Sequence, residues 1–268
     1  MLRQRIVTAV VVILLLLAVI LALPRELTII VLSLLLLGGA WEWAAGFLDL
    51  RRWYGRSSYV MVVAAVMLLA WWLAADVTSL EPLLWLALAW WIVATWMVFR
   101  FPFPMRNAVV GACGLFVLVP AWLALARLDL VMPRGRELLL FVLALVWAAD
   151  IGAYFTGRAL GRVKLALRVS PNKTWEGVAG GVAAAAAFSL AGAAWFDLPM
   201  QVFLPLCVAV AGISVIGDLT VSLFKRRSGL KDSGHLFPGH GGLLDRMDSI
   251  TAAAPVFVLG VNWLGIEA

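Results

Sequence analysis

The sequence predicts an all-α integral membrane protein with about nine transmembrane helices around a polar cavity that faces the cytoplasm. Three observations lead to this fold class. The chain is 64% hydrophobic and only 13% charged, so one soluble core cannot hide its apolar surface and lipid has to act as solvent. Apolar stretches of spanning length recur along the chain, without an internal repeat. The Lys and Arg residues lie in the short segments between these stretches.

The predicted spans follow one another closely. The first is too long for the apolar core of a secretory signal, which has roughly 7–15 residues. Only Pro24, Arg25 and Glu26 separate it from the second. The last contains Pro255, which kinks a helix unless neighbours satisfy the freed carbonyl group. The nine spans are expected at about residues 6–23, 27–48, 57–75, 82–99, 106–126, 137–157, 175–196, 199–224 and 247–266.

The distribution of positive charge predicts the orientation. With the N-terminus in the cytoplasm, 17 of the 21 Lys and Arg residues are cytoplasmic, and the others are Arg25, Arg127, Arg134 and Arg136. This asymmetry follows the positive-inside rule. It puts the polar residues 222–249 on the cytoplasmic side, where nucleotides are. The net charge of +6 does not indicate nucleic acid, since the sequence has no basic stripe interleaved with aromatic residues.

Residues 222–249 are polar in an otherwise apolar chain. They include both histidines, three carboxylates, five cations and five glycines. Glycines let the backbone turn sharply and approach a ligand closely. Cations beside such a backbone suit phosphates, and nearby carboxylates suit a Mg²⁺ ion that carries those phosphates. The segment therefore predicts a site for a phosphate-bearing ligand.

Carboxylates flank this segment on two successive helices. Asp218 lies inside a span, where it needs a partner and should face the bundle interior or a wet cavity. On a helix, Asp218, Ser222 and Lys225 share one face, and an Asp218–Lys225 pair that only fixes packing is the structural alternative. Asp245 and Asp248 lie three residues apart, and complementing the helix dipole is their simpler interpretation. Asp218 and Asp245 could converge on one Mg²⁺, with phosphates and water completing its shell.

Polar residues also lie within two earlier spans. Asp150 and Tyr154 are four residues apart and share a helix face. Glu42, in Gly-Gly-Ala-Trp-Glu-Trp, has no evident chemistry, and a structural and a functional role are equally open for it.

The basic loop after the sixth span offers a phosphate cradle. Ser170 followed by Pro171 is typical of an N-cap and the first residue of a helix. Free amides there, with Lys173 and Thr174, would bind phosphate. Topology and contact with lipid headgroups are the alternative explanation of the basic residues. Glu176 is expected to line the cavity, and a simple first-turn acid of the following helix is the alternative.

The segment from Ser222 to Asp248 resembles the signature of the phosphatidate cytidylyltransferases at every position. That signature reads S-x-hydrophobic-K-R, four residues, K-D-x-small, two residues, hydrophobic, P/G-x-H-G-G-hydrophobic-x-D-R-hydrophobic-D. Residues 150–157 and 170–177 resemble the family's D-x-x-A-Y-x-x-G and S-P-x-K-T-x-E-G elements. The resemblance covers roughly residues 145–250. We therefore divide the chain into scaffold helices, 1–126, and a catalytic region, 127–268.

The resemblance implies transfer of CMP from CTP to phosphatidic acid, in a bacterial-type inner membrane, giving CDP-diacylglycerol and pyrophosphate. Its implied partners are CTP, phosphatidic acid, the lipid bilayer and a second copy of the chain, without nucleic acid. Its implied cofactor is Mg²⁺, as one or two divalent ions, with a second, monovalent ion left open. The candidate metal ligands are Asp218 and Asp245. The candidate catalytic residues are Asp218, Lys225, Arg226, Lys231, Asp232, His240, Asp245, Arg246 and Asp248. The candidate substrate-binding residues are Asp150, Tyr154, Ser170, Asn172, Lys173, Thr174, Glu176, Ser222, Gly241 and Gly242.

Two alternatives are left open. A CTP-dependent transferase for another lipid phosphate would differ only in its lipid-facing helices. An ion-coupled transporter would use Asp150 and Asp218 as ion sites, but the sequence lacks the inverted halves with paired broken helices that such transporters show.

Overall fold

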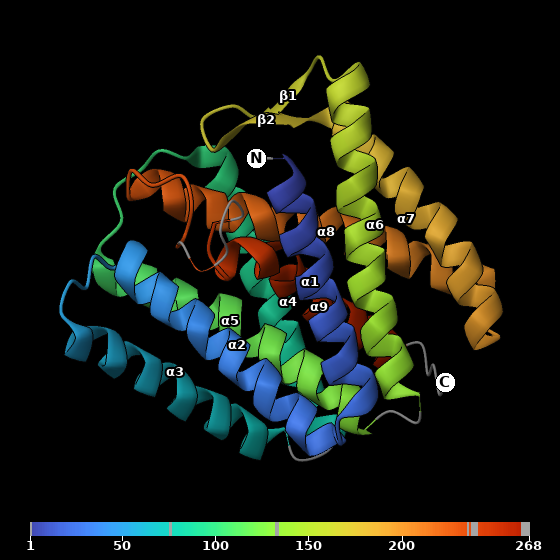
Figure 1. Cartoon of the computed structure of the whole chain (residues 1–268), viewed down its shortest axis with the longest axis horizontal. Helices are drawn as coiled ribbons and strands as arrows, with labels where there is room; N and C mark the ends of the chain where they lie inside the picture. Colours follow the sequence, from blue (N-terminus) through green and yellow to red (C-terminus); the bar gives the residue numbers. More distant parts are fainter. Residues whose placement is uncertain (1, 75–76, 132–133, 235, 237–240, 264–268) are drawn as a thin grey trace.

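The computed structural model describes residues 2–74, 77–131, 134–234, 236 and 241–263. Across these residues the chain forms nine α-helices and one short β-hairpin (Figure 1). Each predicted span coincides with one helix, and the ends differ by a few residues, so the all-α prediction is confirmed. The helices are α1 (Leu2–Ala22), α2 (Arg25–Gly46), α3 (Trp53–Leu73), α4 (Val77–Arg100), α5 (Asn107–Val131), α6 (Gly135–Leu160), α7 (Trp175–Phe196), α8 (Met200–Arg227) and α9 (Leu244–Trp263).

Seven of the described helices, α2 to α8, are long and apolar enough to cross a membrane. In α1 the described apolar stretch is the shorter Val10–Ala22. The first turns of α9 carry Asp245, Arg246 and Asp248 and are therefore polar. The chain is an integral membrane protein, and the number of nine spans stays a prediction.

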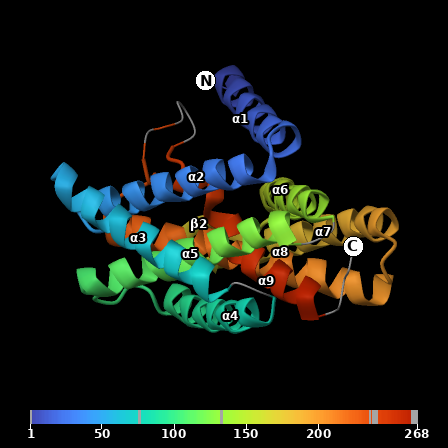
Figure 2. The same ribbon diagram turned by 90° about the horizontal axis from the view of Figure 1, so that it is seen from below.

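Helix α9 lies at the centre of the bundle (Figure 2). It packs against α8, α5, α4, α6 and α2, and most of its residues are buried. Helices from both parts of the predicted division thus meet on α9, and α5 runs through the predicted boundary after residue 126. The helix continues through Pro255. This packing keeps the polar start of α9 inside protein and away from lipid.

Helices α6 and α7 pack backbone against backbone. A methyl group added at Gly152 would lie 2.6 Å from Ala184 Cβ, and one added at Gly181 would lie 2.8 Å from the Ala149 carbonyl oxygen. Small residues allow such close contact between membrane helices, where lipid leaves no hydrophobic drive for association. The pair forms one wall of the candidate site.

A short antiparallel hairpin connects these two helices. Strand β1 (Lys164–Ala166) pairs with β2 (Ser170–Thr174), so that Lys164 faces Thr174 and Ala166 faces Ser170. The prediction of a helix start at Ser170 and Pro171 is therefore wrong. The segment is extended because it bonds to β1, and the fixed φ of proline suits an extended backbone as well as a first helical turn.

Thr174 is the residue that caps α7. Its hydroxyl accepts a hydrogen bond from the backbone N–H of Gly177, at 3.2 Å. This bond satisfies one of the amides that have no partner within a helix's first turn. The cap fixes the end of β2 on α7 and so holds the hairpin over the site.

Candidate active site

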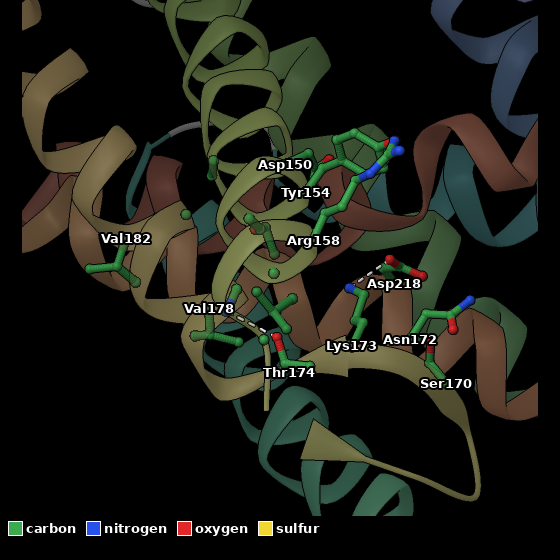
Figure 3. Close-up of a pocket in the computed structure, with 18 of the residues that line it drawn as sticks. Asp150, Tyr154, Arg158, Ser170, Asn172, Lys173, Thr174, Val178, Val182 and Asp218 are labelled. Carbon is green, nitrogen blue, oxygen red and sulfur yellow. Dashed lines mark hydrogen bonds and ion pairs between the residues drawn. The ribbon is translucent and has the colours of Figure 1, made fainter. Parts of the chain in front are cut away.

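A cavity of about 630 Å³ lies between α6, the hairpin, α7 and α8 (Figure 3). Part of its wall is apolar and includes Val178, Val182, Ala211 and Val215. A cavity with one apolar and one polar part suits a ligand with a charged head and a hydrocarbon portion. The polar lining residues are Asp150, Tyr154, Arg158, Lys164, Ser170, Asn172, Lys173, Thr174, Ser214 and Asp218.

An ion pair between Lys173 and Asp218 borders the cavity. The Lys173 Nζ atom of β2 lies 2.6 Å from Asp218 Oδ2 of α8, and the side chains are 24% and 27% exposed. Figure 3 shows the two side chains pointing toward each other. The other Asp218 oxygen accepts a hydrogen bond from Ser222 Oγ, at 3.2 Å. The helix face that Asp218 and Ser222 were predicted to share is confirmed.

Two more carboxylates lie near Asp218. Asp150 of α6 lines the cavity and lies 3.5 Å from the Ser249 hydroxyl. Asp248 of α9 is buried and accepts a 2.9 Å hydrogen bond from the Ser249 backbone N–H. The three carboxylates interact electrostatically with one another and with Lys173. Three helices therefore bring carboxyl groups to one place, and within a bilayer such groups need cations or hydrogen-bond donors as partners.

Lys225 is a buried cation, and its partner is Asp245. The Lys225 Nζ atom lies 2.7 Å from Asp245 Oδ1, and the two side chains are 11% and 5% exposed. The other Asp245 oxygen accepts hydrogen bonds from the backbone N–H groups of Ser233, at 2.8 Å, and Gly242, at 2.9 Å. The Asp218–Lys225 packing pair considered from the sequence is therefore replaced by two separate pairs.

Protein side chains, rather than space for a ligand, account for two glycines of the polar segment. Gly241 has a φ of 81°, and a methyl group there would lie 2.6 Å from Asp245 Oδ2. A methyl group at Gly242 would overlap Ser233 Oγ and a Glu42 oxygen. These glycines bring the backbone close to carboxylates, and their predicted contact with a ligand stays a prediction.

Arg226 ties α8 to the hairpin. It donates hydrogen bonds to the backbone carbonyl oxygens of Val169, at 3.2 Å, and Leu230, at 3.1 Å. Val169 precedes β2, so Arg226 helps to fix the strand that carries Lys173.

The remaining charged candidates of the signature lie at the surface. Lys231, Asp232 and Arg246 are exposed. Arg246 interacts electrostatically with Asp150 and so lies within reach of the cavity's charges. His240 lies outside the described residues.

Glu176 does not line the cavity as expected. Both of its oxygens accept a hydrogen bond from the backbone N–H of Val163, at 3.1 and 3.2 Å. This bond joins the first turn of α7 to the residue before β1. Tyr154 does line the cavity, and its hydroxyl accepts a 3.0 Å hydrogen bond from Arg158.

The donor set of the cavity fits Mg²⁺ at Asp218 and Asp150, whose carboxylates both line it. Mg²⁺ takes hard oxygen ligands and commonly binds one or two carboxylates together with phosphates and water. Asp245 fits this role less well than Asp218, because its side chain is only 5% exposed and is bonded to Lys225 and two backbone N–H groups, whereas Asp218 is 27% exposed beside the cavity. Within the described residues no group of three or more His, Cys, Asp or Glu is arranged to hold a metal ion. Phosphate and water oxygens would therefore have to complete the shell.

Three polar cavity residues were missed from the sequence: Arg158, Lys164 and Ser214. Arg158 follows Tyr154 by one helical turn, so helix periodicity alone places it on the same face. Lys164 was attributed to topology. Its place at the cavity depends on the hairpin, whose sequence has no periodic pattern.

Comparison with known proteins agrees with the motifs. A model of the cytidylyltransferase family matches residues 3–264. The phosphatidate cytidylyltransferase of Pseudomonas aeruginosa is 43% identical over 267 residues, which cover 96% of both chains. That of Haemophilus influenzae is 38% identical over 287 residues, 96% of this chain and 97% of the relative. That of Brucella suis is 48% identical over 149 residues, 55% of each chain. The similarity therefore extends beyond the motifs into the N-terminal helices.

Proposed function

The chain belongs to the cytidylyltransferase family, and we propose that it transfers CMP from CTP to phosphatidic acid in the cavity bordered by Lys173 and Asp218. The products are CDP-diacylglycerol and pyrophosphate. The observation that carries the proposal is that cavity, in which two motif segments of the family and membrane helix α8 surround a space with a polar and an apolar wall. Relatives named phosphatidate cytidylyltransferase align with almost the whole chain.

The reaction is a phosphoryl-group displacement that needs little acid–base help. A phosphate oxygen of phosphatidic acid attacks the α-phosphorus of CTP and forms a new P–O–P linkage. The bond from the α-phosphorus to the oxygen that bridges to the β-phosphorus breaks, and pyrophosphate leaves. Because the attacking oxygen is already anionic, the protein's task is to bring two polyanions together and to neutralise their charge.

Cations of two kinds surround the site for this task. Lys173, Arg158 and Lys164 line the cavity and can contact phosphate oxygens directly. Lys173 would exchange its partly exposed bond to Asp218 for a bond to phosphate. Lys225, fixed by Asp245, would instead act as a constant positive charge, and the exposed Lys231 and Arg246 would clamp phosphates from the cytoplasmic side.

Asp218, with Asp150 beside it, would hold Mg²⁺. The ion, when bound, supplies positive charge to the α-phosphoryl group and to the leaving pyrophosphate. The buried Asp248 lies close by and interacts electrostatically with Asp218. A second cation, divalent or monovalent, is part of the same proposal.

The site would face the cytoplasm of a bacterial-type cell from the inner membrane. The count of cations on each side of the membrane supports this orientation, and CTP is a cytoplasmic substrate. A homodimer, implied by the family resemblance, is part of the same proposal.

The direct test is an assay of the purified protein in detergent micelles with labelled CTP, Mg²⁺ and phosphatidic acid. Label should enter the lipid fraction with an equal amount of pyrophosphate, and neither product should form without phosphatidic acid. Substitution of an isoprenoid phosphate for phosphatidic acid tests the other lipid acceptor. Absence of CDP-diacylglycerol from an intact, correctly folded protein would refute the proposed function.

A variant pair tests whether the cavity is the active site. Lys173→Met keeps the aliphatic length of the side chain but removes the charge, and kcat/KM should fall by about 100-fold or more, as for a lost charge-assisted hydrogen bond. Arg168→Met removes an exposed cation from the turn of the same hairpin and should leave kcat/KM within a factor of about two, as for surface charges. Equal behaviour of the two variants would move the active site elsewhere.

A further inference from the structure

Glu42 of α2 makes hydrogen bonds to a region of the chain that begins almost 200 residues later. Its Oε1 atom accepts a bond from the backbone N–H of Leu243, at 2.8 Å. Its Oε2 atom accepts one from the N–H of Leu244, at 2.9 Å, and another from Ser233 Oγ, at 2.8 Å. The carboxylate thus bonds on both sides of residues 234–242, the glycine-rich segment within the connection from α8 to α9.

These bonds complement the bonds of Asp245. Asp245 accepts from the backbone N–H groups of Ser233 and Gly242, while Glu42 accepts from the Ser233 hydroxyl and from the next two N–H groups along the chain. The amides at the start of α9 have no partner within the helix, and the helix dipole favours negative charge there. Two carboxylates from different helices therefore bind the chain at both ends of the glycine-rich segment.

The glycine-rich segment packs closely against Glu42. A methyl group at Gly234 or at Gly242 would overlap the Glu42 carboxylate. The neighbouring Trp43 is buried, and its ring lies 4.8 Å from that of Phe224 in α8. Phe224 directly precedes Lys225, so α2 is fixed against α8 at the level of the buried cation. Glu42 therefore holds the segment from a rigid support.

Ser233 links Glu42 to the charges of the site. Its hydroxyl bonds to Glu42, and its backbone N–H bonds to the Asp245 oxygen opposite the one that holds Lys225. Lys225 also interacts electrostatically with Asp218. Any shift of Ser233 would thus move the partner of Lys225 and the chain that follows it.

We propose that Glu42 is a positioning residue for the reaction: by holding both ends of the glycine-rich segment, it keeps Lys225 and the two cations that flank the segment, Lys231 and Arg246, in place for CTP. Glu42 is not among the residues that line the cavity and would act through this segment. The inference rests on the proposed function, and it adds a residue outside the signature, in the region assigned to the scaffold.

The test measures the KM values of two Glu42 variants and of a control variant at the other end of α2. Glu42→Ala should raise the KM for CTP about tenfold or more, as for loss of hydrogen bonds to a charged group, and leave the KM for phosphatidic acid unchanged. Glu42→Gln, which keeps one acceptor oxygen, should give a smaller rise. Glu26→Gln changes an exposed carboxylate in the first turn of α2 and should match the parent. A role in folding alone would lower the apparent kcat and leave both KM values unchanged, and that result would overturn the proposal.

A second variant decides the question if Glu42→Ala does not fold. Ser233→Ala removes one of the three bonds to Glu42 and should raise the KM for CTP by a few-fold. Combined with Glu42→Gln, its effect should be less than additive, because both changes act on the same contact. Additive effects, or an unchanged KM for CTP in Ser233→Ala, would refute the inference. An inactive parent protein would refute the proposed function and the inference with it, whereas an active parent with normal Glu42 variants would refute the inference alone.

Discussion

Lys225 and Lys173 are both cations close to Asp218, yet their surroundings give them different roles. The Lys225–Asp245 pair is almost completely buried, whereas the Lys173–Asp218 pair borders the open cavity. Loss of one partner from a buried pair leaves an uncompensated charge, which is strongly destabilising. A partly exposed pair can exchange its partner for a ligand at little cost. Lys225 therefore suits a fixed charge and Lys173 a cation that binds and releases phosphate.

This difference predicts opposite stabilities for two Asp→Asn variants. Asp245→Asn leaves Lys225 buried without a counter-charge and should destabilise the protein by about 3–5 kcal/mol, with loss of activity. Asp218→Asn should lose activity to a similar degree and its Mg²⁺ response, yet unfold within about 1 kcal/mol of the parent, because Lys173 is partly exposed. Thermal unfolding in detergent and the CDP-diacylglycerol assay measure the two effects.

The double variant Lys225→Met with Asp245→Asn supplies the control. It removes both buried charges and should recover part of the lost stability without recovering activity. If Asp245→Asn unfolds like the parent but no longer responds to Mg²⁺, Asp245 is the metal ligand that the sequence suggested.

The predictions for single residues succeed where a contact lies within one helix. They fail where a contact joins segments that are far apart in the sequence. Asp218 and Ser222 are one helical turn apart, so helix periodicity places them together. The pairing of Lys225 with Asp245 depends on the path of the glycine-rich segment between them. Glu42 meets Leu243 across 201 residues, and no pattern within α2 indicates such a contact. These long-range bonds are visible only in the assembled bundle.

At the scale of elements, the helices are predictable because each is a long apolar run. The hairpin could not be predicted. Strands β1 and β2 have three and five residues, too few to show an alternating pattern, and several of those residues are charged or polar. The signal at Ser170 and Pro171 was compatible with a helix start and with a strand. Pairing with β1 decided between them.

The contact between α6 and α7 can be tested by filling it. Gly152→Val would put a side chain against Ala184 and the Gly180 carbonyl oxygen of α7, at distances below 3 Å for the first carbon alone. Separation of the helices should destabilise the protein by about 1–3 kcal/mol, as overpacking does. It should also lower activity, because α6 and α7 carry the walls of the cavity.

Gly212→Val in α8 is the matched control. A methyl group at Gly212 would meet no described atom within 4 Å, so this variant should unfold and react like the parent. Equal unfolding midpoints for Gly152→Val and Gly212→Val would show that the close contact between α6 and α7 does not limit stability.

At the scale of the whole molecule, the arrangement of charge is consistent with one orientation. In Figure 1 the hairpin and the start of α1 lie at one end of the bundle, and the connection from α1 to α2 lies at the other. Arginines assigned to that second end bond to protein groups: Arg25 to the Leu130 carbonyl oxygen, Arg136 to that of Leu23, and Arg134 to Glu137. Positive charge on this side is thus neutralised or bound within the protein, whereas Lys231 and Arg246 at the other end are exposed.

The two ends of α8 give a test of this orientation within one helix. Gln201 is exposed near the start of α8, and Ser228 is half-buried just after its end. The two native cysteines, Cys113 and Cys207, are buried, so background labelling should be low. With an impermeant thiol reagent on intact cells, Gln201→Cys should be labelled at once, and Ser228→Cys only after the membrane is permeabilised. The reverse pattern would put the glycine-rich segment outside the cell, away from CTP, and would contradict both the positive-inside assignment and the cytoplasmic active site.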